Sequence, residues 1–409
     1  MSNFTKDPKG SERGDLHQDT LAARYAVDTD EAHGAVIPPL YMSSNFSFHG
    51  FGEKREYDYT RSGNPTRDQL ADALAALEGG TGGVITASGM SAVHLATQLA
   101  SPGELIVAPH DCYGGCHRLF TAAAKKGQFE LEWLPLWETA RSVEKIQELK
   151  PRIVWIETPS NPLLRITDIE AIAEAAHAVD ALVVVDNTFL SPAGQTPFKL
   201  GADIVLHSTT KYINGHSDVV GGAVLAKDEA LVEELTWWAN CLGLTGSPFD
   251  SYQTLRGLRT LKVRYRQHEE NAAAVAEFLD ANDLVGKVYY PGLRSHLGHG
   301  TARRQQSSFG AMISFEIDAT DDEIPLFLRE LKLFTLAESL GGVESLVAHP
   351  ASMTHAAMSE QDQAAAGISP KLLRLSIGIE HVEDLRADLA AGFEAVRAQR
   401  EHRKVRSVA

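Results

Sequence analysis

Hydrophobic residues along this chain follow two alternating patterns. Short continuous apolar runs, such as ALVVV at 181–185, are typical of parallel strands covered on both faces. Further runs of strand length occupy 84–86, 104–109, 129–136, 152–156 and 204–206. Between several of them, apolar residues recur at helical spacing, as in Leu70, Leu74 and Leu77. This alternation predicts an α/β protein with a mainly parallel sheet clad by helices.

Capping signals predict where two of the helices begin and where one ends. Thr66 and Gln69 have the spacing of a capping box, in which two side chains satisfy backbone donors reciprocally. Thr167 and Glu170 repeat this spacing before the next clear helical pattern. Gly79 suits the left-handed conformation that ends a helix.

The C-terminal part of the chain has longer helical patterns and fewer strands. One strand-like run covers 310–317, and farther on alternation places Leu373 and Leu375 on one face and Arg374 on the other. An amphipathic helix closes the chain, and its charged tail after Arg397 is expected to fray.

Composition and charge narrow the classes of function. With 38 Lys and Arg against 54 Asp and Glu, the formal net charge is −16, which argues against nucleic acid or an anionic membrane as a partner. The sequence contains no apolar run of about 18 residues, the length of a membrane span. Residues 1–19 are polar and are expected to be mobile. Three cysteines in 409 residues do not make a disulfide framework, so we expect a cytoplasmic protein.

Two of the predicted strands end in groups that suit one particular cofactor. Asp186 follows the strand at 181–185, and the strand at 204–206 leads into HSTTK, which contains Lys211. Ligands of open α/β sheets bind beyond such carboxyl ends. Pyridoxal phosphate (PLP) needs an amine to form a Schiff base and a carboxylate to keep its ring nitrogen protonated. Ser208 and Thr210 would donate to its phosphate. The alternative is an exposed lysine, with Asp186 as a turn residue or helix cap.

Other strand ends add candidate groups. Ser88, Gly89 and Met90 join the strand at 84–86 to a helix, and the free N–H groups and dipole of a helix start bind phosphate. A plain β–α turn is the alternative there. Cys112 and Cys116 lie near histidines but lack paired C-x-x-C spacing, so no metal site is predicted.

The stretch DNTFLSPAGQTPFKLGADIVLHSTTKYINGHSDVVGG at 186–222 resembles the cystathionine γ-synthase and γ-lyase branch of the Cys/Met metabolism PLP-dependent enzymes. The resemblance runs from about Thr20 to Phe393 and includes GFGEKREYDYTRSGNPTRD, APHDCYGGCHRLF and LFTLAESLGGVESL. It implies PLP as cofactor and the PLP-dependent transferase fold type I, aspartate-aminotransferase-like, with a smaller C-terminal α/β domain. The implied domains are an arm at 1–62 that reaches a neighbouring subunit, a PLP-binding domain at 63–256 and a small domain at 257–409.

The resemblance also assigns roles to residues around the cofactor. Lys211 would carry the Schiff base, Tyr113 would stack on the ring and move protons, and Asn161 would lie beside the phenolic oxygen and the substrate carboxylate. Thr188 is a further expected cofactor contact. Tyr59 and Arg61 would bind the phosphate of a neighbour's site, which implies a dimer at least, and a homotetramer built as a dimer of dimers.

The same resemblance assigns residues to the binding of the substrate. A planar guanidinium suits capture of an α-carboxylate, so Arg374 is the candidate, with a surface arginine on an edge strand as the alternative. The remaining expected substrate contacts are Asn161, Ser339, Glu338, Arg118 and Asp58.

Two positions distinguish the branches of the family. Glu338 stands where methionine γ-lyases usually carry an apolar residue and β-lyases an aromatic one. Gly115 stands where methionine γ-lyases tend to have a cysteine, and Cys116 comes one position later. The resemblance therefore favours γ-replacement on an O-acyl-homoserine by cysteine in methionine biosynthesis and transsulfuration, with the succinyl donor suggested by Arg118. Cystathionine γ-lyase, methionine γ-lyase, O-acetylhomoserine sulfhydrylase and a non-catalytic binding protein of the same fold stay open as alternatives.

Overall fold

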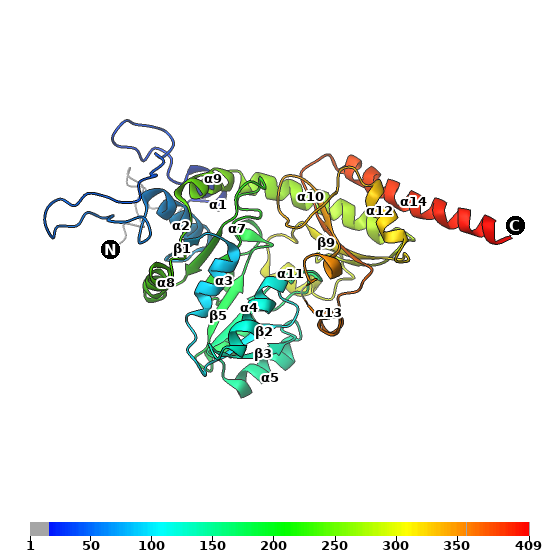
Figure 1. Ribbon diagram of the computed structural model, residues 1–409, viewed down its shortest axis with the longest axis horizontal. Helices are drawn as coiled ribbons and strands as arrows, with labels where there is room; N and C mark the ends of the chain where they lie inside the picture. The colour runs from blue at the N-terminus through cyan, green and yellow to red at the C-terminus, as the bar shows by residue number, and fades with distance from the viewer. Residues whose placement is uncertain (1–15, 357, 409) are drawn as a thin grey trace.

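The larger of two β-sheets forms the centre of the molecule. The computed structural model describes residues 16–356 and 358–408, and within them the large sheet has seven strands in the order β1-β7-β6-β5-β4-β2-β3 (Figure 1). Six of the strands run in one direction and β7 runs in the opposite direction between β1 and β6, which confirms the predicted, mainly parallel sheet. The strands are β1 Gly82–Thr86, β2 Leu105–Pro109, β3 Glu130–Leu134, β4 Ile153–Glu157, β5 Leu182–Asp186, β6 Ile204–His207 and β7 Gly222–Ala226.

Helices bury both faces of this sheet, which explains why its strands are almost wholly apolar. Val183 and Val185 of β5 belong to one hydrophobic core and Val184 to another, as the two-residue period of a strand requires. The first core includes residues of α2, α6 and α10, and the second includes residues of α3, α4 and α8. The helices of this part are α1 Gln18–Arg24, α2 Pro65–Glu78, α3 Gly89–Thr97, α4 Gly114–Lys125, α5 Thr139–Leu149, α6 Ile169–His177, α7 Ser191–Gly194, the 3₁₀ helix η2 Pro197–Leu200, α8 Glu229–Leu242 and α9 Pro248–Leu258.

A second, smaller sheet lies beside the first. It has five strands in the order β10-β11-β12-β9-β8, antiparallel except for the β10–β11 pair. The expected boundary at residue 257 falls near the end of α9, just before the long helix α10. The elements of this part are α10 Leu261–Asp280, β8 Val285–Tyr289, α11 His299–Gln305, β9 Met312–Ile317, α12 Glu323–Glu330, β10 Thr335–Leu336, β11 Leu346–Ala348, η3 Pro350–Ser352, α13 Glu360–Ala366, β12 Leu372–Ser376 and α14 Val382–Val408.

Strand alternation sorts the polar groups at the carboxyl edge of the large sheet. Glu157 and Asp186 are paired in register at the ends of β4 and β5 and follow Trp155 and Val184, so both lie on the face of α3 and α4. His207 follows Val205 onto the opposite face, where it contacts Glu78 of α2. The large sheet therefore presents its two terminal carboxylates on one side.

Both predicted capping boxes are wrong by a residue or two. Asn64, not Thr66, caps α2, and its side-chain oxygen accepts from the N–H groups of Thr66 and Arg67. Pro65 then takes the first helical position, where its fixed φ and missing N–H cost nothing. At α6 the cap is Asp168, which accepts from the N–H of Ala171. Gly79 does end α2 in the left-handed region, with φ of 85°.

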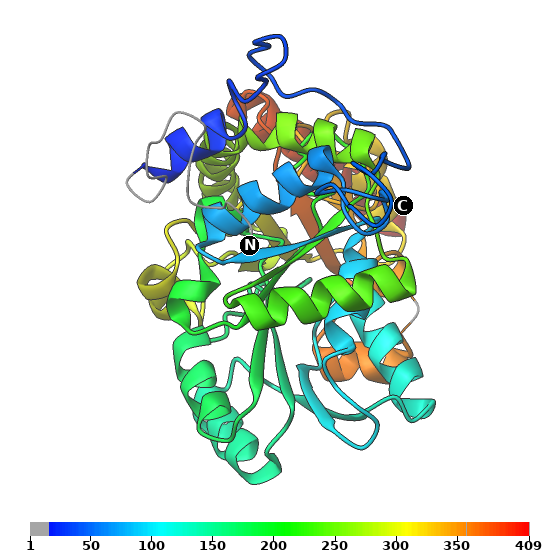
Figure 2. The same cartoon turned by 90° about the vertical axis from the view of Figure 1, so that its left-hand side faces the viewer.

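The arm leaves the body of the molecule as long loops. Figures 1 and 2 both show the segment between α1 and α2 extending clear of the helices. It exposes large apolar side chains, among them Val36, Met42 and Phe51. Of the stretch expected to be mobile, residues 1–15 lie outside the described residues, and α1 already begins at Gln18. An apolar arm standing in solvent is suited to contact with another protein surface.

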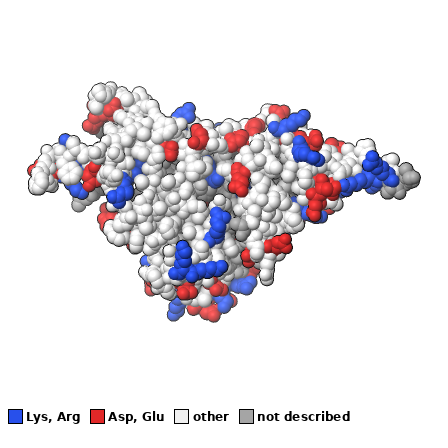
Figure 3. All heavy atoms as spheres, in the orientation of Figure 1, with Lys and Arg blue, Asp and Glu red and all other residues white. Residues whose placement is uncertain are grey.

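Ion pairs are spread over the surface and concentrate at α14. On the face drawn in Figure 3, acidic and basic side chains are intermixed, and no extended field of one sign covers it.

In the described part of the chain, no helix has the length and apolar character needed to span a bilayer.

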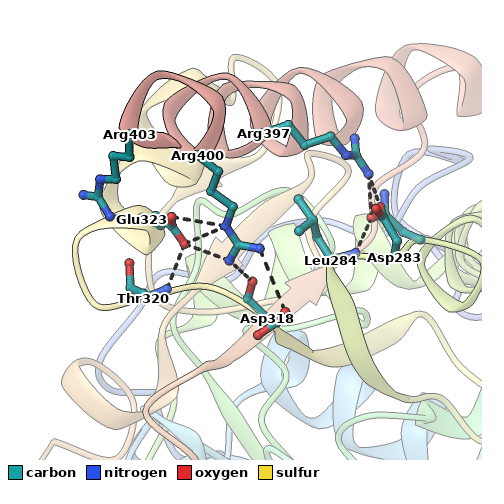
Figure 4. Close-up of polar contacts among 9 residues, drawn as sticks. Asp283, Leu284, Asp318, Thr320, Glu323, Arg397, Arg400 and Arg403 are labelled. Carbon is teal, nitrogen blue, oxygen red and sulfur yellow. Dashed lines mark hydrogen bonds and ion pairs between the residues drawn. The ribbon is translucent and has the colours of Figure 1, made fainter. Parts of the chain in front are cut away.

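The expected fraying of the chain after Arg397 is wrong within the described residues, because α14 continues to Val408. Three arginines on successive turns of α14 pair with acidic groups of the small domain, and Figure 4 draws the contacts of Arg397 and Arg400. Arg397 pairs with Asp283, Arg403 pairs with Asp322, and Arg400 donates to Glu323 from Nε at 3.2 Å and from Nη2 at 2.8 Å. Charges that look like a solvated tail in the sequence are thus fixed by partners about 80 to 115 residues earlier.

Replacing Arg400 with alanine should lower the free energy of unfolding by about 2 kcal/mol, because the Glu323 side chain is 2% exposed and would lose the guanidinium that hydrogen-bonds to it, keeping only Arg403 at 3.8 Å. Urea unfolding measures this change. Since pairing with Arg400 lowers the pKa of Glu323, the deficit should shrink as falling pH protonates that carboxylate.

The matched control is Arg397→Ala, whose acidic partners are mostly exposed, and it should cost clearly less. Alanine is at least as good a helix former as arginine, so equal losses for the two variants would show that the burial of Glu323 adds nothing to its pair with Arg400.

Candidate active site

One cavity of about 480 Å³ gathers most of the residues singled out in the sequence. It lies at the carboxyl ends of β5 and β6, beside the start of α3, and is closed from the other side by residues of the small domain. Both predicted groups of the cofactor chemistry, Lys211 and Asp186, line it. The other predicted residues on its wall are Ser88, Gly89, Met90, Tyr113, Arg118, Asn161, Thr188, Ser208, Thr210, Glu338, Ser339 and Arg374.

Lys211 follows β6 in a turn, and its amine reaches across to the small domain. The Nζ atom donates to Ser339 Oγ at 2.6 Å. Burial, followed by the cation of Arg374, lowers the pKa of Lys211 to about 8, although the charge of Glu338 partly opposes this shift. About a tenth of this amine is therefore neutral at pH 7, far more than for an ordinary lysine, and only the neutral form acts as a nucleophile or a general base.

Ser339 owes its position to an unusual backbone conformation. Its φ of 83° is rarely adopted by a residue with a side chain. In this conformation its hydroxyl accepts from Lys211 while its carbonyl accepts from Arg374 Nη2 at 2.9 Å. One strained residue thus links the two cationic groups of the cavity.

Asp186 is oriented by Thr188. The Thr188 N–H donates to Asp186 Oδ1 at 2.9 Å, and the Thr188 hydroxyl accepts from the N–H of Ser208 at 2.9 Å. Burial raises the pKa of Asp186 above its ordinary value, and the hydrogen bonds from Thr188 oppose this. A desolvated carboxylate of this kind is best stabilised by a proton or a cationic N–H placed against it.

The start of α3 provides an anion cradle. Ser88 caps the helix and accepts from the N–H of Ser91 at 3.1 Å. A Cβ atom on Gly89 would lie 2.8 Å from Ser208 Cβ, so only glycine permits this close approach of the two loops. The Thr210 hydroxyl is shared with Gly221, whose carbonyl and N–H it contacts at 3.2 and 3.0 Å. The free N–H groups at the start of α3 and the hydroxyls of Ser88 and Thr210 fit a phosphate.

Arg374 lies on an interior strand of the small sheet and is 3% exposed, so the surface-arginine alternative is wrong. It points away from Leu373 and Leu375, as the alternation predicts. Its Nη1 donates to Asn161 Oδ1 at 2.9 Å, and its Nε is buried without a protein partner. Burial lowers its pKa to about 10, so the guanidinium stays charged and suits a carboxylate ligand.

Glu157 is a cavity residue that the sequence reading did not single out. Its two carboxylate oxygens accept from the N–H of Tyr113 at 2.8 Å and from the N–H of Asn161 at 3.1 Å. Burial, followed by the neighbouring charge of Asp186, raises its pKa well above the ordinary value. The available signal was the one used for Asp186, a carboxylate that directly ends a fully apolar strand.

Three predicted residues lie apart from this cavity in the same chain. Tyr59 and Arg61 are on the arm, and Arg61 Nη1 donates to the Asn240 carbonyl at 2.7 Å. Asp58 pairs with Lys54 at 2.7 Å and accepts from the Ser62 hydroxyl. Within one subunit, these three residues of the arm therefore do not contribute to the cavity of their own chain.

The cavity residues fit PLP. An amine of lowered pKa, a desolvated carboxylate and a helix-start anion cradle share one space, and they match the aldehyde, ring nitrogen and phosphate of that cofactor. Lys211, Asp186 and the loop around Gly89 would hold these three parts. Tyr113, about two-fifths exposed, offers an aromatic face on the same wall.

The thiols near the cavity do not suggest a metal. Burial raises the pKa values of Cys112 and Cys116 well above the ordinary range, which disfavours the thiolates that bind metals. Among the described residues, no three His, Cys, Asp or Glu side chains are grouped closely enough to hold an ion.

Comparison with known proteins gives one consistent family. Residues 19–394 match the model of the family described as Cys/Met metabolism PLP-dependent enzyme. Cystathionine gamma-synthase of Escherichia coli K12 is 54% identical over 379 residues, which cover 92% of this chain and 98% of that protein. Cystathionine beta-lyase of Lactococcus lactis subsp. cremoris MG1363 is 44% identical, with 90% and 96% covered. The crystal structure of cystathionine gamma synthase from Xanthomonas oryzae pv. oryzae with aminoacrylate and cysteine is 61% identical, covering 94% of this chain and 99% of that one, with a TM-score of 0.92.

The pKa of Lys211 predicts how cofactor-free protein takes up PLP. Only the neutral amine attacks an aldehyde, so the rate of covalent attachment should rise with pH through a midpoint near 8. Borohydride trapping followed by mass spectrometry measures this rate at each pH.

The control is Arg374→Gln, which removes a cation that lowers the Lys211 pKa and should move the midpoint upward. A native midpoint near 10.5, the ordinary value for lysine, would mean that the cavity does not desolvate this amine.

Proposed function

Because the chain belongs to the Cys/Met metabolism PLP-dependent enzyme family, we propose that it catalyses γ-replacement, joining O-succinyl-L-homoserine to L-cysteine to give L-cystathionine and succinate. The observation that supports this best is the convergence of Lys211, Arg374 and Glu338 on one cavity. They supply an amine, an α-carboxylate receptor and an acid for a second amino group. The identity of 54% with one γ-synthase and 61% with another, above the 44% with a β-lyase, favours the same reaction, although two mycobacterial γ-synthases are 46% identical.

Substrate binding in this proposal uses groups that are already oriented. The Arg374 guanidinium, held by Asn161 and Ser339, binds the α-carboxylate of the homoserine ester. This places the substrate Cα near Lys211, because the Lys211 amine and Arg374 both contact Ser339. Orientation of this kind supplies much of the rate of a multistep reaction.

Proton movement falls to Lys211. Bound PLP supplies an electron sink that stabilises negative charge at the substrate Cα. The Lys211 amine removes the Cα proton and then moves protons between Cα and Cβ, a task suited to a pKa of about 8. The Cγ–O bond breaks and succinate leaves. The cysteine sulfur then forms the Cγ–S bond, and the thiol proton balances the departing carboxylate.

Exposed residues at the cavity mouth select the two substrates. Glu338 is exposed to solvent there and pairs with the amino group of incoming cysteine. Arg118 is also exposed on the cavity wall and receives the free carboxylate of the succinyl group, which an acetyl group lacks.

The arm completes the site of a neighbouring subunit in this proposal. Tyr59 and Arg61 do not line the cavity of their own chain, where Arg61 instead contacts Asn240 of α8, and the loops of the arm extend from the body with apolar side chains exposed. A second copy would cover those side chains and receive a guanidinium for the phosphate of its cofactor. We propose a dimer with shared sites as the active unit, paired into a homotetramer.

The reaction is tested with pure protein given O-succinylhomoserine and cysteine, with chromatographic detection of cystathionine. We expect cystathionine as the main product, and Lys211→Ala should lower its rate by about 10³-fold because the proton carrier is lost. Arg118→Leu should raise KM for the succinyl donor about tenfold and leave the acetyl donor nearly unchanged.

Cystathionine offered alone is the control for the γ-lyase alternative. Rapid formation of 2-oxobutyrate from it, with little γ-replacement, would overturn the proposed synthase. Pyruvate and homocysteine as main products would instead show a β-lyase.

The shared site is tested by mixing two inactive variants. Lys211→Ala and Arg61→Ala subunits, unfolded and refolded together, should regain about a quarter of native activity, because half of the random dimers carry one intact site. Each variant refolded alone is the control. Activity of the mixture no higher than the sum of those controls would contradict a site built from two chains.

A further inference from the structure

The segment HPASMTH at 349–355 covers the cavity, yet the proposed reaction gives it no task. It follows β11, forms the short helix η3, and contributes Met353 and Thr354 to the cavity wall. A Cβ atom on Gly114 would lie 2.8 Å from the Thr354 carbonyl oxygen, so the segment packs tightly on the turn after Tyr113. Gln363 of α13 fixes the segment from outside, donating to the carbonyls of Ala351 and His355 at 3.0 and 2.9 Å.

His355 ends this segment and is 1% exposed. Its Nε2 lies 3.1 Å from the main-chain carbonyl oxygen of Asn161, and its Nδ1 lies 2.8 Å from the Thr354 hydroxyl. A carbonyl oxygen only accepts, so Nε2 carries the proton and Nδ1 accepts from Thr354. Burial and the cation of Arg374 lower the pKa of His355 to about 4, so the ring stays neutral with this one donor.

Asn161 is held at three atoms by three separate elements. Its N–H donates to Glu157 at the end of β4, its carbonyl accepts from His355, and its side-chain oxygen accepts from Arg374 of β12. Among the described residues no partner takes up its Nδ2 group. A side chain whose oxygen is fixed in this way has only its N–H₂ group to offer the cavity that it lines.

We propose that His355 is a positioning residue, which locks the main chain of Asn161 so that its side-chain N–H₂ donates to the cofactor or substrate. The inference rests on the proposed placement of Asn161 beside the PLP oxygen. Without the imidazole donor, the Asn161 carbonyl would be buried and unsatisfied, and its peptide would turn to find another donor. The contacts with Arg374 and Glu157 alone do not fix the direction of the Asn161 side-chain amide. Its N–H₂ group would therefore turn away from the cofactor or substrate.

A hydrogen bond to the phenolic oxygen of PLP favours its ionised form, so its loss raises the pH at which the bound cofactor changes colour. The test measures that midpoint by visible absorption in the holoenzyme, without substrate. Asn161→Ala removes the donor itself, His355→Leu removes the lock, and His355→Gln keeps an N–H at nearly the same place. His268→Leu is the matched control, a histidine as deeply buried that contacts the Ile377 carbonyl.

We expect Asn161→Ala and His355→Leu to raise the midpoint by about 0.5 to 1 pH unit, the effect of one hydrogen bond. His355→Gln and His268→Leu should stay at the native value. His355→Leu should also raise KM for the amino-acid substrate about fivefold while kcat changes less, because the ground-state orientation of Asn161 is lost. Thermal unfolding confirms that each variant is folded with cofactor bound.

A shift in Asn161→Ala with none in His355→Leu would overturn the positioning role. Equal shifts of the midpoint in His355→Leu and His268→Leu would also overturn it, since the loss of any buried histidine would then have the same effect. If Asn161→Ala leaves the midpoint unchanged, Asn161 does not donate to the PLP oxygen, and this inference fails as well. The expected shifts in a protein that forms no cystathionine would keep the inference and reject the proposed reaction.

Discussion

Desolvation of charged groups at the carboxyl edge of the large sheet is the constraint on which the rest of this structure depends. Lys211, Asp186, Glu157 and Arg374 are all removed from water, and each departs from its ordinary pKa mainly for that reason. Such burial is unfavourable in the protein alone. It becomes useful when the charges and protons of a cofactor and an amino-acid substrate provide the missing partners.

The two sheets contribute different parts of that environment. The parallel sheet supplies the carboxylates and the anion cradle, because its strands end and its helices begin at one edge. The small sheet supplies Arg374 and, through the loop after β10, Ser339 and Glu338. A hydrogen bond between Lys211 and Ser339 joins the two halves, so the amine and the carboxylate receptor keep their relation to each other.

Asn161 shows how the surrounding protein controls a single amide. Glu157 ends β4, Arg374 lies on β12 and His355 lies in the loop after η3, and together they leave that residue one free polar group. The ion pairs of α14 with the small domain serve stability at a distance from the cavity (Figure 4). Polar contacts therefore have two tasks here, orientation at the cavity and attachment of the last helix.

The sequence by itself determined the alternating elements, the parallel sheet and the groups at strand ends, because periods of 2.0 and 3.6 residues and the position of Asp186 and Lys211 are local properties. It misplaced the caps of α2 and α6, where Asn64 and Asp168 compete with neighbouring threonines, and it read the α14 tail as solvated. Neither Glu157 nor His355 is assigned a role by the sequence. Their meaning depends on partners such as Tyr113 and Asn161, at distances of 44 and 194 residues in the chain, and only folding brings such groups together.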